Sequence, residues 1–400
     1  MLYALAATPA GAEPAASEVV AAIPVALAVE TAGGGASDIQ TRLDSVAAPI
    51  VAGQKLHTGL LRQFYATHDF QPVWSTHAAQ AAALLGAVMR AGEHGLDPHL
   101  FHADLLRNAS SLTPTDRELL LSDAFLGYAD ALARGILPVE QRMDDEDLRP
   151  EAVSIPSVLD SAINSPEPAA VIEALAPQSA DYLALRRALE SYRKGGAGDA
   201  PTPADAHNRR SAERADGARL RDIAANLERL RWLPRHLPPD RIWVNLPSEQ
   251  LVLYRNNQPV FTTRVIIGQP DWQTPELETE VTSVLYNPPW NVPPSIAREE
   301  ILPKLARDPG YLTRHHMVWR GNGMLQQVPG RGGSALGQLK LEMPNRFDVY
   351  LHDTPEKQLF RRDRRTVSHG CVRVQNPREL AALLLQQPVE TINQAIARGA

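Results

Sequence analysis

The stretch TVSHGCVRV, residues 366–374, contains Cys371, the single cysteine of a 400-residue chain. Val372 and Val374 alternate with Cys371 and Arg373, which is typical of a β-strand that has one apolar face. Such a strand would place the thiol and the guanidinium together on its other face. A lone thiol cannot form a disulfide within the chain, so it is either a small buried hydrophobe or a reactive group.

A second stretch, RFDVYLHD at residues 346–353, alternates in the same way. Its apolar residues would face the core, which leaves Tyr350 and His352 directed at solvent or a cleft. If the two strands are neighbours in one sheet, His352 can approach Cys371 on the open face. A thiol with an ordinary pKa of about 8.5 needs a base to become a nucleophile. His352 is therefore the candidate general base, and a solvated surface histidine is the alternative.

The residues just before the cysteine suit a tight loop around a nucleophile. Gly370 would allow a close backbone approach, and its N–H would join that of Cys371 in an oxyanion hole. His369 would orient the loop or bind substrate, and Ser368 would hydrogen-bond within it. On pattern alone, other kinds of thiol hydrolase remain open.

Length and composition set the class of protein. Four hundred residues exceed what one hydrophobic core usually serves, so two or more domains are expected. A net charge of −6 gives no general attraction to nucleic acid, which is not an expected partner. No run approaches the ~20 apolar residues that cross a bilayer. Residues 1–37 are rich in Ala, Pro and Gly, and are predicted to be a disordered tail or the remnant of a signal peptide.

The rest of the chain divides by pattern into helical and β-rich parts. Helical periodicity runs through residues 38–193, and residues 194–217 are predicted to be a linker. Residues 218–390 are predicted to start with an amphipathic helix and then to turn β-rich. Within them, residues 287–343 begin with the Pro-rich run NPPWNVPPS and read as a long excursion from the sheet, typical of a lid. The predicted fold class is α+β and multidomain.

The run SHGCVRV, with a histidine 19 positions upstream of its cysteine, resembles the signature of L,D-transpeptidases with a YkuD-type catalytic domain. Other stretches resemble the long, YcbB-like branch of that family, among them VNLPSEQLVLYRNNQPV, NPPWNVPPSI, YLHDTPEKQLF, FYATHDFQPVW and AGEHGLDP. The resemblance covers about residues 50–390. It implies a β-rich catalytic domain preceded by an amino-terminal helical scaffold domain.

The resemblance also implies an enzyme of the periplasm or cell envelope of a Gram-negative bacterium, acting on peptidoglycan stem peptides. Cys371 would attack the diaminopimelate carbonyl of a donor tetrapeptide, release D-alanine and pass the acyl group to an amine, forming a 3–3 cross-link. His352 carries over as general base, and His369 and Gly370 as parts of the nucleophile loop. Arg373 carries over as a residue that positions the substrate or the loop.

Further implications concern the cleft, the partners and the alternatives. Tyr350 and Trp290 carry over as aromatic residues of the cleft and the lid. The resemblance implies carbapenems as covalent inhibitors, other cell-wall synthesis proteins as partners, a role in cell shape, and no cofactor. No metal site is predicted, because the adjacent pair His315 and His316 cannot easily share one tetrahedral ion. The alternatives are hydrolysis of the same acyl-enzyme by water, attachment of a protein to peptidoglycan, and a non-catalytic wall-binding scaffold.

The sequence departs from the family pattern at two places, and it contains one cluster of positive charge near the candidate site. Relatives in this branch usually carry a peptidoglycan-binding module where this chain has the predicted linker. The run SALG, residues 334–337, replaces the more usual NALG, so the hinge of the lid is expected to differ. Four arginines lie between the candidate base and the nucleophile, and we expect them to bind the carboxylates of stem peptides. They are Arg361, Arg362, Arg364 and Arg365.

Overall fold

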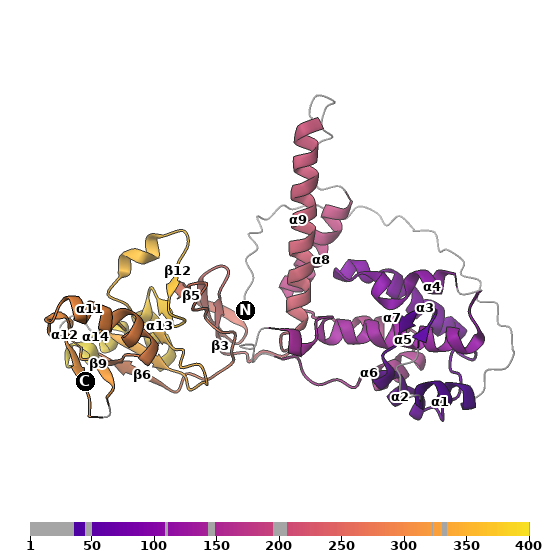
Figure 1. The fold of residues 1–400 in the computed structure, drawn as a ribbon, viewed down its shortest axis with the longest axis horizontal. Coiled ribbons are helices and arrows are strands. Elements are labelled where there is room, and N and C mark those ends of the chain that lie inside the picture. The colour runs from indigo at the N-terminus through magenta and orange to yellow at the C-terminus, as the bar shows by residue number, and fades with distance from the viewer. Residues whose placement is uncertain are drawn as a thin grey trace. The chain divides into compact units, whose positions relative to one another are not determined.

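The computed structural model describes residues 36–44, 50–108, 111–142, 149–194, 206–321, 323–329 and 334–399. Within them the chain forms two compact units, a helical one that ends at Arg235 and a β-rich one that begins at His236 (Figure 1). The α+β multidomain class predicted from the sequence is confirmed. The predicted amino-terminal tail falls outside the described residues up to residue 35.

The helical unit is built around α5, a long helix that is buried on nearly all of its faces. Thr113 caps this helix by accepting a hydrogen bond from the Asp116 N–H at 3.1 Å, and Pro114 occupies its first turn. The helices are α1 (Ala36–Asp44), α2 (Thr58–Ala66), α3 (Ala78–Met89), α4 (Ala103–Arg107), α5 (Pro114–Arg134), α6 (Ile155–Ile163), α7 (Pro168–Glu173), α8 (Ala180–Arg193) and α9 (Ala206–Arg231). Short helices η1 (Ala91–His94), η2 (Pro98–Phe101) and η4 (Val139–Gln141) and the strands β1 (Ile50–Val51) and β2 (Gln54–Lys55) complete it.

The predicted linker is wrong over its second half, where residues 206–217 form the first turns of α9. The Ala, Arg and Glu residues of this stretch are strong helix formers. Further along, α9 packs beside α8 and buries Ile223, Leu227 and Leu230. The amphipathic helix assigned to the β-rich domain therefore belongs to the helical unit, and the boundary moves from residue 218 to about residue 236.

The β-rich unit is organised by one sheet with strand order β3-β4-β5-β13-β11-β10-β6, and β12 pairs with β5 beside this path. β13 runs antiparallel to β5 and parallel to β11. The strands are β3 (Arg241–Asn245), β4 (Gln250–Arg255), β5 (Gln258–Gly268), β6 (Ser283–Tyr286), β10 (Leu339–Glu342), β11 (Leu351–His352), β12 (Thr366–Ser368) and β13 (Val372–Val374). The order brings the two predicted site strands, β11 and β13, together at the centre of the sheet.

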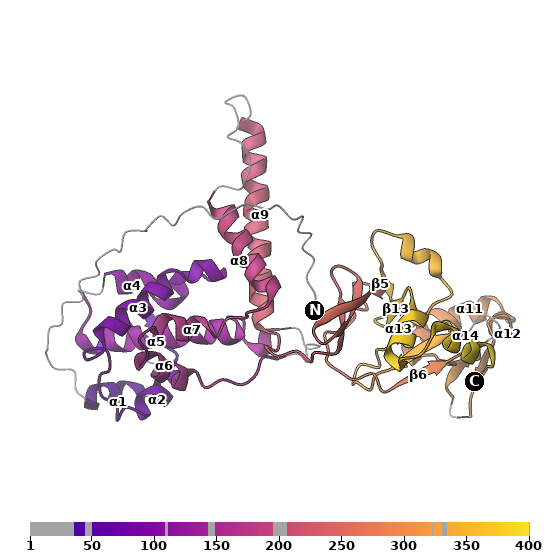
Figure 2. The ribbon, with the colours of Figure 1, turned by 180° about the vertical axis from the view of Figure 1, so that it is seen from behind.

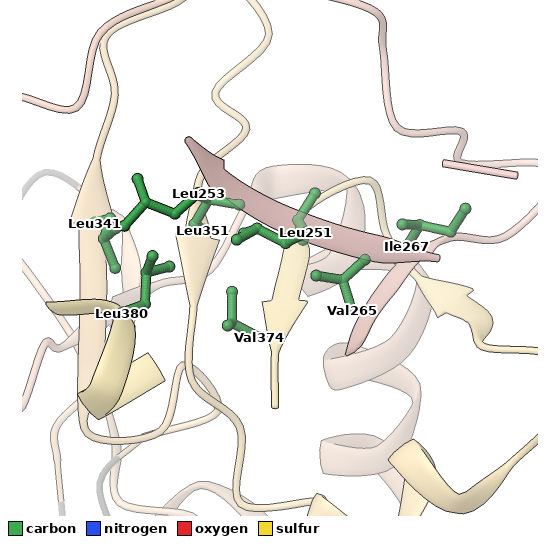
Figure 3. Packing of buried hydrophobic residues seen from close by; sticks show 9 residues of the cluster. Leu251, Leu253, Val265, Ile267, Leu341, Leu351, Val374 and Leu380 are labelled. Atoms are coloured by element: carbon green, nitrogen blue, oxygen red, sulfur yellow. The ribbon is translucent and has the colours of Figure 1, made fainter. Parts of the chain in front are cut away.

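One face of this sheet is packed against the core. Figure 3 shows Val265, Leu351 and Val374 from three strands gathered with Leu380 of α13 (Pro377–Leu385). A second cluster packs α13 and α14 (Val389–Ala397) onto β10. Burying one such side chain contributes about 1.5–3 kcal/mol, so the register of these strands is strongly specified. The alternate residues of β11 and β13 must therefore face away from this core.

The strand predicted over residues 346–353 is shorter than its alternation suggests. Only Leu351 and His352 pair with neighbouring strands, and the preceding residues form a turn in which Asp348 has a φ of +53°. The side chain of Asn345 holds this turn by accepting the N–H groups of Phe347 and Val349 at 3.0 and 3.2 Å. A local side-chain hydrogen bond thus competes successfully with the strand.

The predicted lid is a small folded subdomain. It contains the sheet β7-β9-β8 and a set of helices around a core of Val292, Ile296, Ile301, Met317 and Leu325. Its elements are β7 (Trp290–Asn291), α10 (Pro294–Ile296), η5 (Ala297–Ile301), α11 (Leu302–Arg307), α12 (Tyr311–Arg314), β8 (Met317–Trp319) and β9 (Leu325–Gln327). The excursion ends earlier than expected, because residues 339–342 form β10 of the main sheet.

Candidate active site

The register of the central strands gathers the candidate site residues on the open face of the sheet. His352 lies opposite Arg373 on one side and opposite Lys340 on the other. Because Leu351 pairs with Val372, Tyr350 lies next to Cys371 one step earlier along the two parallel strands. The register of β11 and β13 therefore puts Cys371 and His352 on the same face of the sheet.

The thiol is half-buried and in contact with Tyr350. Its sulfur lies 3.9 Å from the carbonyl oxygen of Asp348, and the Tyr350 hydroxyl hydrogen-bonds to it. Burial raises the pKa of the Cys371 thiol above the range of an ordinary cysteine, against the opposing effects of Tyr350 and the charges of Lys340 and Arg373. Burial also raises the pKa of the Tyr350 hydroxyl well above 10.0, so this group is a neutral donor.

The imidazole of His352 is buried and uncharged. Burial, and after it the charge of Arg373, lowers the pKa of His352 to about 4, although backbone groups of Asp353 and Leu336 favour the protonated ring. Its Nδ1 is buried and has no hydrogen-bond partner among the described residues. The ring lies 5.6 Å from that of Tyr350. Within the described residues no hydrogen bond joins this ring to Cys371, and the directions of both pKa shifts favour a neutral thiol beside a neutral imidazole.

The carboxylate of Asp353 secures the backbone next to His352. It accepts the N–H of Gln338 at 2.8 Å and pairs with Lys357 at 2.6 Å. Gly337 passes so close that a Cβ there would lie 2.4 Å from the Asp353 Cγ, and its φ of +67° also favours glycine. This contact explains why the SALG run ends in glycine.

Ser334 replaces the more usual asparagine and still closes the hinge of the lid. Its hydroxyl donates to the carbonyl of Pro288 at 2.9 Å and accepts the N–H of Leu336 at 3.1 Å. One side chain therefore forms hydrogen bonds with residues at both ends of the predicted lid.

The nucleophile loop is held together by Ser368. Its hydroxyl accepts the N–H of Gly370 at 3.2 Å and donates to the carbonyl of Cys371 at 2.6 Å. Gly370 has a φ of +103°, and its carbonyl accepts a hydrogen bond from Thr274 at 2.7 Å. The predicted oxyanion role of the Gly370 N–H is contradicted, because that group is already bonded. The Cys371 N–H donates no hydrogen bond within the described part of the chain.

Two family models match the chain in the same order as the two units. Residues 239–390 match the L,D-transpeptidase catalytic domain, YkuD, and residues 59–189 match the model described as a scaffold domain. The chain carries a YkuD-type L,D-transpeptidase catalytic domain. Its β-rich unit is called the transpeptidase domain from here on.

Two known proteins resemble this chain over part of its length. A Haemophilus influenzae protein, provisionally named an L,D-transpeptidase, is 37% identical over 183 residues, which are 41% of this chain and 37% of that protein. The match thus spans well under half of the relative. A solved structure, the Ldtfm-avibactam carbamoyl enzyme, is 12% identical, covers 40% of this chain and 54% of the other, and has a TM-score of 0.22. That structural similarity is too low to support an argument.

Three further predicted site residues, His369, Arg373 and Trp290, pair with carboxylates or pack within the lid. The Nε2 of His369 lies 2.5 Å from a carboxylate oxygen of Glu300, and an Nη of Arg373 lies 2.5 Å from a carboxylate oxygen of Glu356. Trp290 is half-buried and packs against the core of the lid. The structure therefore gathers Cys371, His352 and their neighbours, and gives Trp290 a place within the lid subdomain.

One residue beside the candidate site, Lys340, was missed by the sequence reasoning. The Nζ of Lys340 lies 4.0 Å from the centre of the Tyr350 ring and 2.9 Å from the Glu342 carboxylate. The alternation in LKLE, residues 339–342, could have assigned Lys340 to the open face, but only the strand order shows that it reaches the site.

The arginine cluster divides into one buried and three exposed residues. Arg365 is buried, donates to the carbonyl oxygens of Val265 and Glu249, and pairs with the Glu249 carboxylate at 3.3 Å. It is an anchor of the loop, so its predicted role in binding substrate is wrong. The exposed members, Arg361, Arg362 and Arg364, form no salt bridge with another described residue. Figures 1 and 2 both show the segment around η6 (Lys357–Arg361) standing out from the sheet.

The helical unit contains one group of titratable side chains that is arranged around a buried carboxylate. Asp123 contacts the ring nitrogens of His57 at 3.1 Å and His102 at 2.8 Å. Across the described ranges, no set of three or more His, Cys, Asp or Glu residues is arranged to hold a metal ion. Nor does any described helix combine the length and apolarity needed to cross a membrane.

Proposed function

We propose that this protein is a cysteine-dependent L,D-transpeptidase of the bacterial cell envelope, with peptidoglycan stem peptides as its substrates. The observation that carries the proposal is the shared face of β11 and β13, where Cys371, Tyr350 and His352 lie together inside the matched catalytic domain. A wall-binding scaffold without catalysis would have no need of this arrangement around its only thiol.

The first half-reaction forms a thioester. The Cys371 sulfur attacks the diaminopimelate carbonyl carbon of a donor tetrapeptide, and the thiol proton moves to the neutral His352 imidazole as the C–S bond forms. The Cys371 N–H and the positive charges of Lys340 and Arg373 stabilise the oxyanion. The C–N bond to D-alanine then breaks, and the leaving amine takes the proton back from His352.

The second half-reaction transfers the acyl group. The side-chain amine of a diaminopimelate on a neighbouring stem attacks the thioester carbonyl, and His352 accepts a proton from this amine. The C–S bond breaks, the thiol is regenerated and a 3–3 cross-link forms. Water in the same place would give hydrolysis, and an amine of another protein would give attachment to the wall.

The same chemistry predicts that carbapenems are covalent inhibitors of this protein. Their strained amide carbonyl presents the same electrophile to the Cys371 sulfur, and ring opening leaves an acyl group on the thiol. With peptidoglycan as the proposed substrate, the proposed location is the periplasm, the proposed partners are other cell-wall synthesis proteins, and the proposed product would contribute to cell shape.

The three exposed arginines are proposed to guide the donor. Guanidinium groups bind carboxylates in bidentate pairs, and stem peptides carry several carboxylates. Replacing Arg361, Arg362 and Arg364 together by glutamine should raise the Michaelis constant for tetrapeptide at low salt, and the difference should shrink at high salt. An unchanged Michaelis constant at low salt would reject this role.

Product analysis tests the proposed function. Purified protein is incubated with disaccharide-tetrapeptide, and the products are identified by mass spectrometry for the wild type and for Cys371→Ala. Cross-linked dimers with released D-alanine from the wild type alone are the expected result. Tripeptide without dimers would indicate hydrolysis, and no turnover combined with no mass increase on exposure to a carbapenem would indicate a binding protein.

A further inference from the structure

The lid meets the nucleophile loop at one carboxylate. Glu300, in the helical part of the lid, places its Oε1 2.5 Å from the Nε2 of His369, two residues before Cys371. Its other carboxylate oxygen lies 3.6 Å from the Nζ of Lys304 one turn along the helix. Both Glu300 and His369 are partly exposed, so this contact is at the rim of the site.

The local sequence explains why Glu300 points at the loop. Residues 294–307 form a continuous helical stretch that widens into a π-turn, η5, where the Leu302 N–H donates to the carbonyl of Ala297. Pro303 follows directly, and its ring would clash with the carbonyl four residues earlier in a regular α-helix. The helix widens ahead of the proline, and π-turns of this kind shift the direction of nearby side chains.

The nucleophile loop also contacts the residues at and just after the end of β5. The Trp272 ring lies 5.5 Å from the His369 ring in an edge-to-face arrangement. Thr274 donates to the Gly370 carbonyl at 2.7 Å and accepts the N–H of Gly268 at 2.9 Å. The nucleophile loop is thus fixed to β5 on one side, and Glu300 is its ionic contact with the lid.

We propose that Glu300 is a positioning residue for the transpeptidase reaction, which couples the lid to the nucleophile through His369. The carboxylate holds the imidazole, the imidazole fixes the turn of residues 368–371, and this turn sets the direction of the Cys371 sulfur and its N–H group. When the lid moves away, the carboxylate leaves and the loop loses its ionic restraint. The proposal rests on the proposed function for its catalytic readout, but its structural readout is independent of activity.

The experiment compares Glu300→Ala with Glu299→Ala in the full chain. Glu299 lies on the same π-turn, is exposed and forms no ion pair with a described residue, so its replacement removes the same charge without touching His369. Hydrogen–deuterium exchange is measured on the peptide that contains residues 366–374. In parallel, the rate of acyl transfer from tetrapeptide and the melting temperature are measured for each variant, for His369→Ala and for the Glu300→Ala/His369→Ala double variant.

Glu300→Ala is expected to speed exchange in the 366–374 peptide and to lower kcat about tenfold, because a misdirected nucleophile costs rate more than binding. The Michaelis constant and the melting temperature should stay near those of the wild type, and Glu299→Ala should behave as the wild type in every measurement. The double variant should be no slower than His369→Ala. Equal exchange in Glu300→Ala and Glu299→Ala, or additive losses in the double variant, would overturn the proposal. A wild type that turns over no tetrapeptide would refute the proposed function, while the exchange result would still decide the coupling.

Discussion

The protonation state of the resting thiol gives a sharp prediction. Iodoacetamide alkylation of Cys371 is expected to rise by about tenfold for each pH unit between pH 6 and pH 8, because the thiolate is the reactive form and the pKa of this thiol lies above 9.0. The rate at pH 6 should therefore be about a hundredth of the rate at pH 8. The chain has a single cysteine, so the mass increase reports on this site alone.

The directions of two pKa shifts set the resting state. Burial raises the pKa of the Cys371 thiol and lowers that of the His352 imidazole to about 4, so both shifts oppose moving the proton from the sulfur to the ring. A thiolate–imidazolium pair is then a rare species in the free protein. The transfer becomes favourable only when a bound carbonyl carbon accepts the sulfur electrons.

His352→Ala is the matched control for this prediction. With a neutral resting pair, the variant should show the same slope of alkylation rate against pH, within about twofold at each point, although its acyl transfer is lost. A wild-type rate that is flat from pH 6 to pH 8, combined with a steep profile in the variant, would show a preformed ion pair and refute the reasoning.

Three further outcomes are expected. Tyr350→Phe removes the hydroxyl that donates to the sulfur, so the alkylation profile should move to higher pH than that of the wild type. Gly337→Ala should lower the free energy of unfolding of the transpeptidase domain by about 4 kcal/mol in urea titrations, because it adds left-handed backbone strain and displaces the Asp353 carboxylate. Gly323→Ala is the control: Gly323 also has a positive φ, +77°, but no atom lies where its Cβ would be, so this change should lower the free energy of unfolding by about 1 kcal/mol. The pKa of His352 is about 4 in the folded protein and about 6.5 in the unfolded chain, so protonation between these values favours unfolding. The free energy of unfolding should therefore fall as the pH drops from 6.5 to 4, by about 3 kcal/mol more in the wild type than in His352→Gln.

The sequence predicted which side chains share one face of the central strands, because that arrangement depends on period-2 patterning. Val372 and Val374 are buried and Cys371 is not, as the alternation in CVRV requires. The hairpin between β4 and β5 is a local feature of the same kind, because its turn contains Asn256 and Asn257, which both adopt positive φ. Patterns of this kind concern neighbours along the chain, and they hold wherever the core fixes the register.

What sequence patterns could not predict depends on individual side-chain contacts, one of them local and the others between distant residues. Asn345 converts an alternating run into a turn by bonding residues up to four positions away. Lys340 and Glu300 reach the site only because the strand order and the lid bring them there. Arg365 looked like a member of a solvent-exposed cluster, and only the buried Glu249 beneath it shows that it is an internal anchor. At Asn345 a local side-chain hydrogen bond overrides the alternation, whereas at Lys340, Glu300 and Arg365 the deciding contacts are tertiary.

The placement of positive charge in the site favours one order of events. Arg373 lowers the pKa of the His352 imidazole, and together with Lys340 it opposes the rise in the thiol pKa. Both effects favour negative charge on the sulfur or on the carbonyl oxygen, and disfavour a lasting positive charge on the ring. In the proposed mechanism, a proton taken up by His352 is held on a ring with a pKa of about 4, which passes it readily to the leaving amine. Burial makes the resting thiol slow to ionise, and the positive charges would then favour collapse of the proposed tetrahedral intermediate toward the thioester.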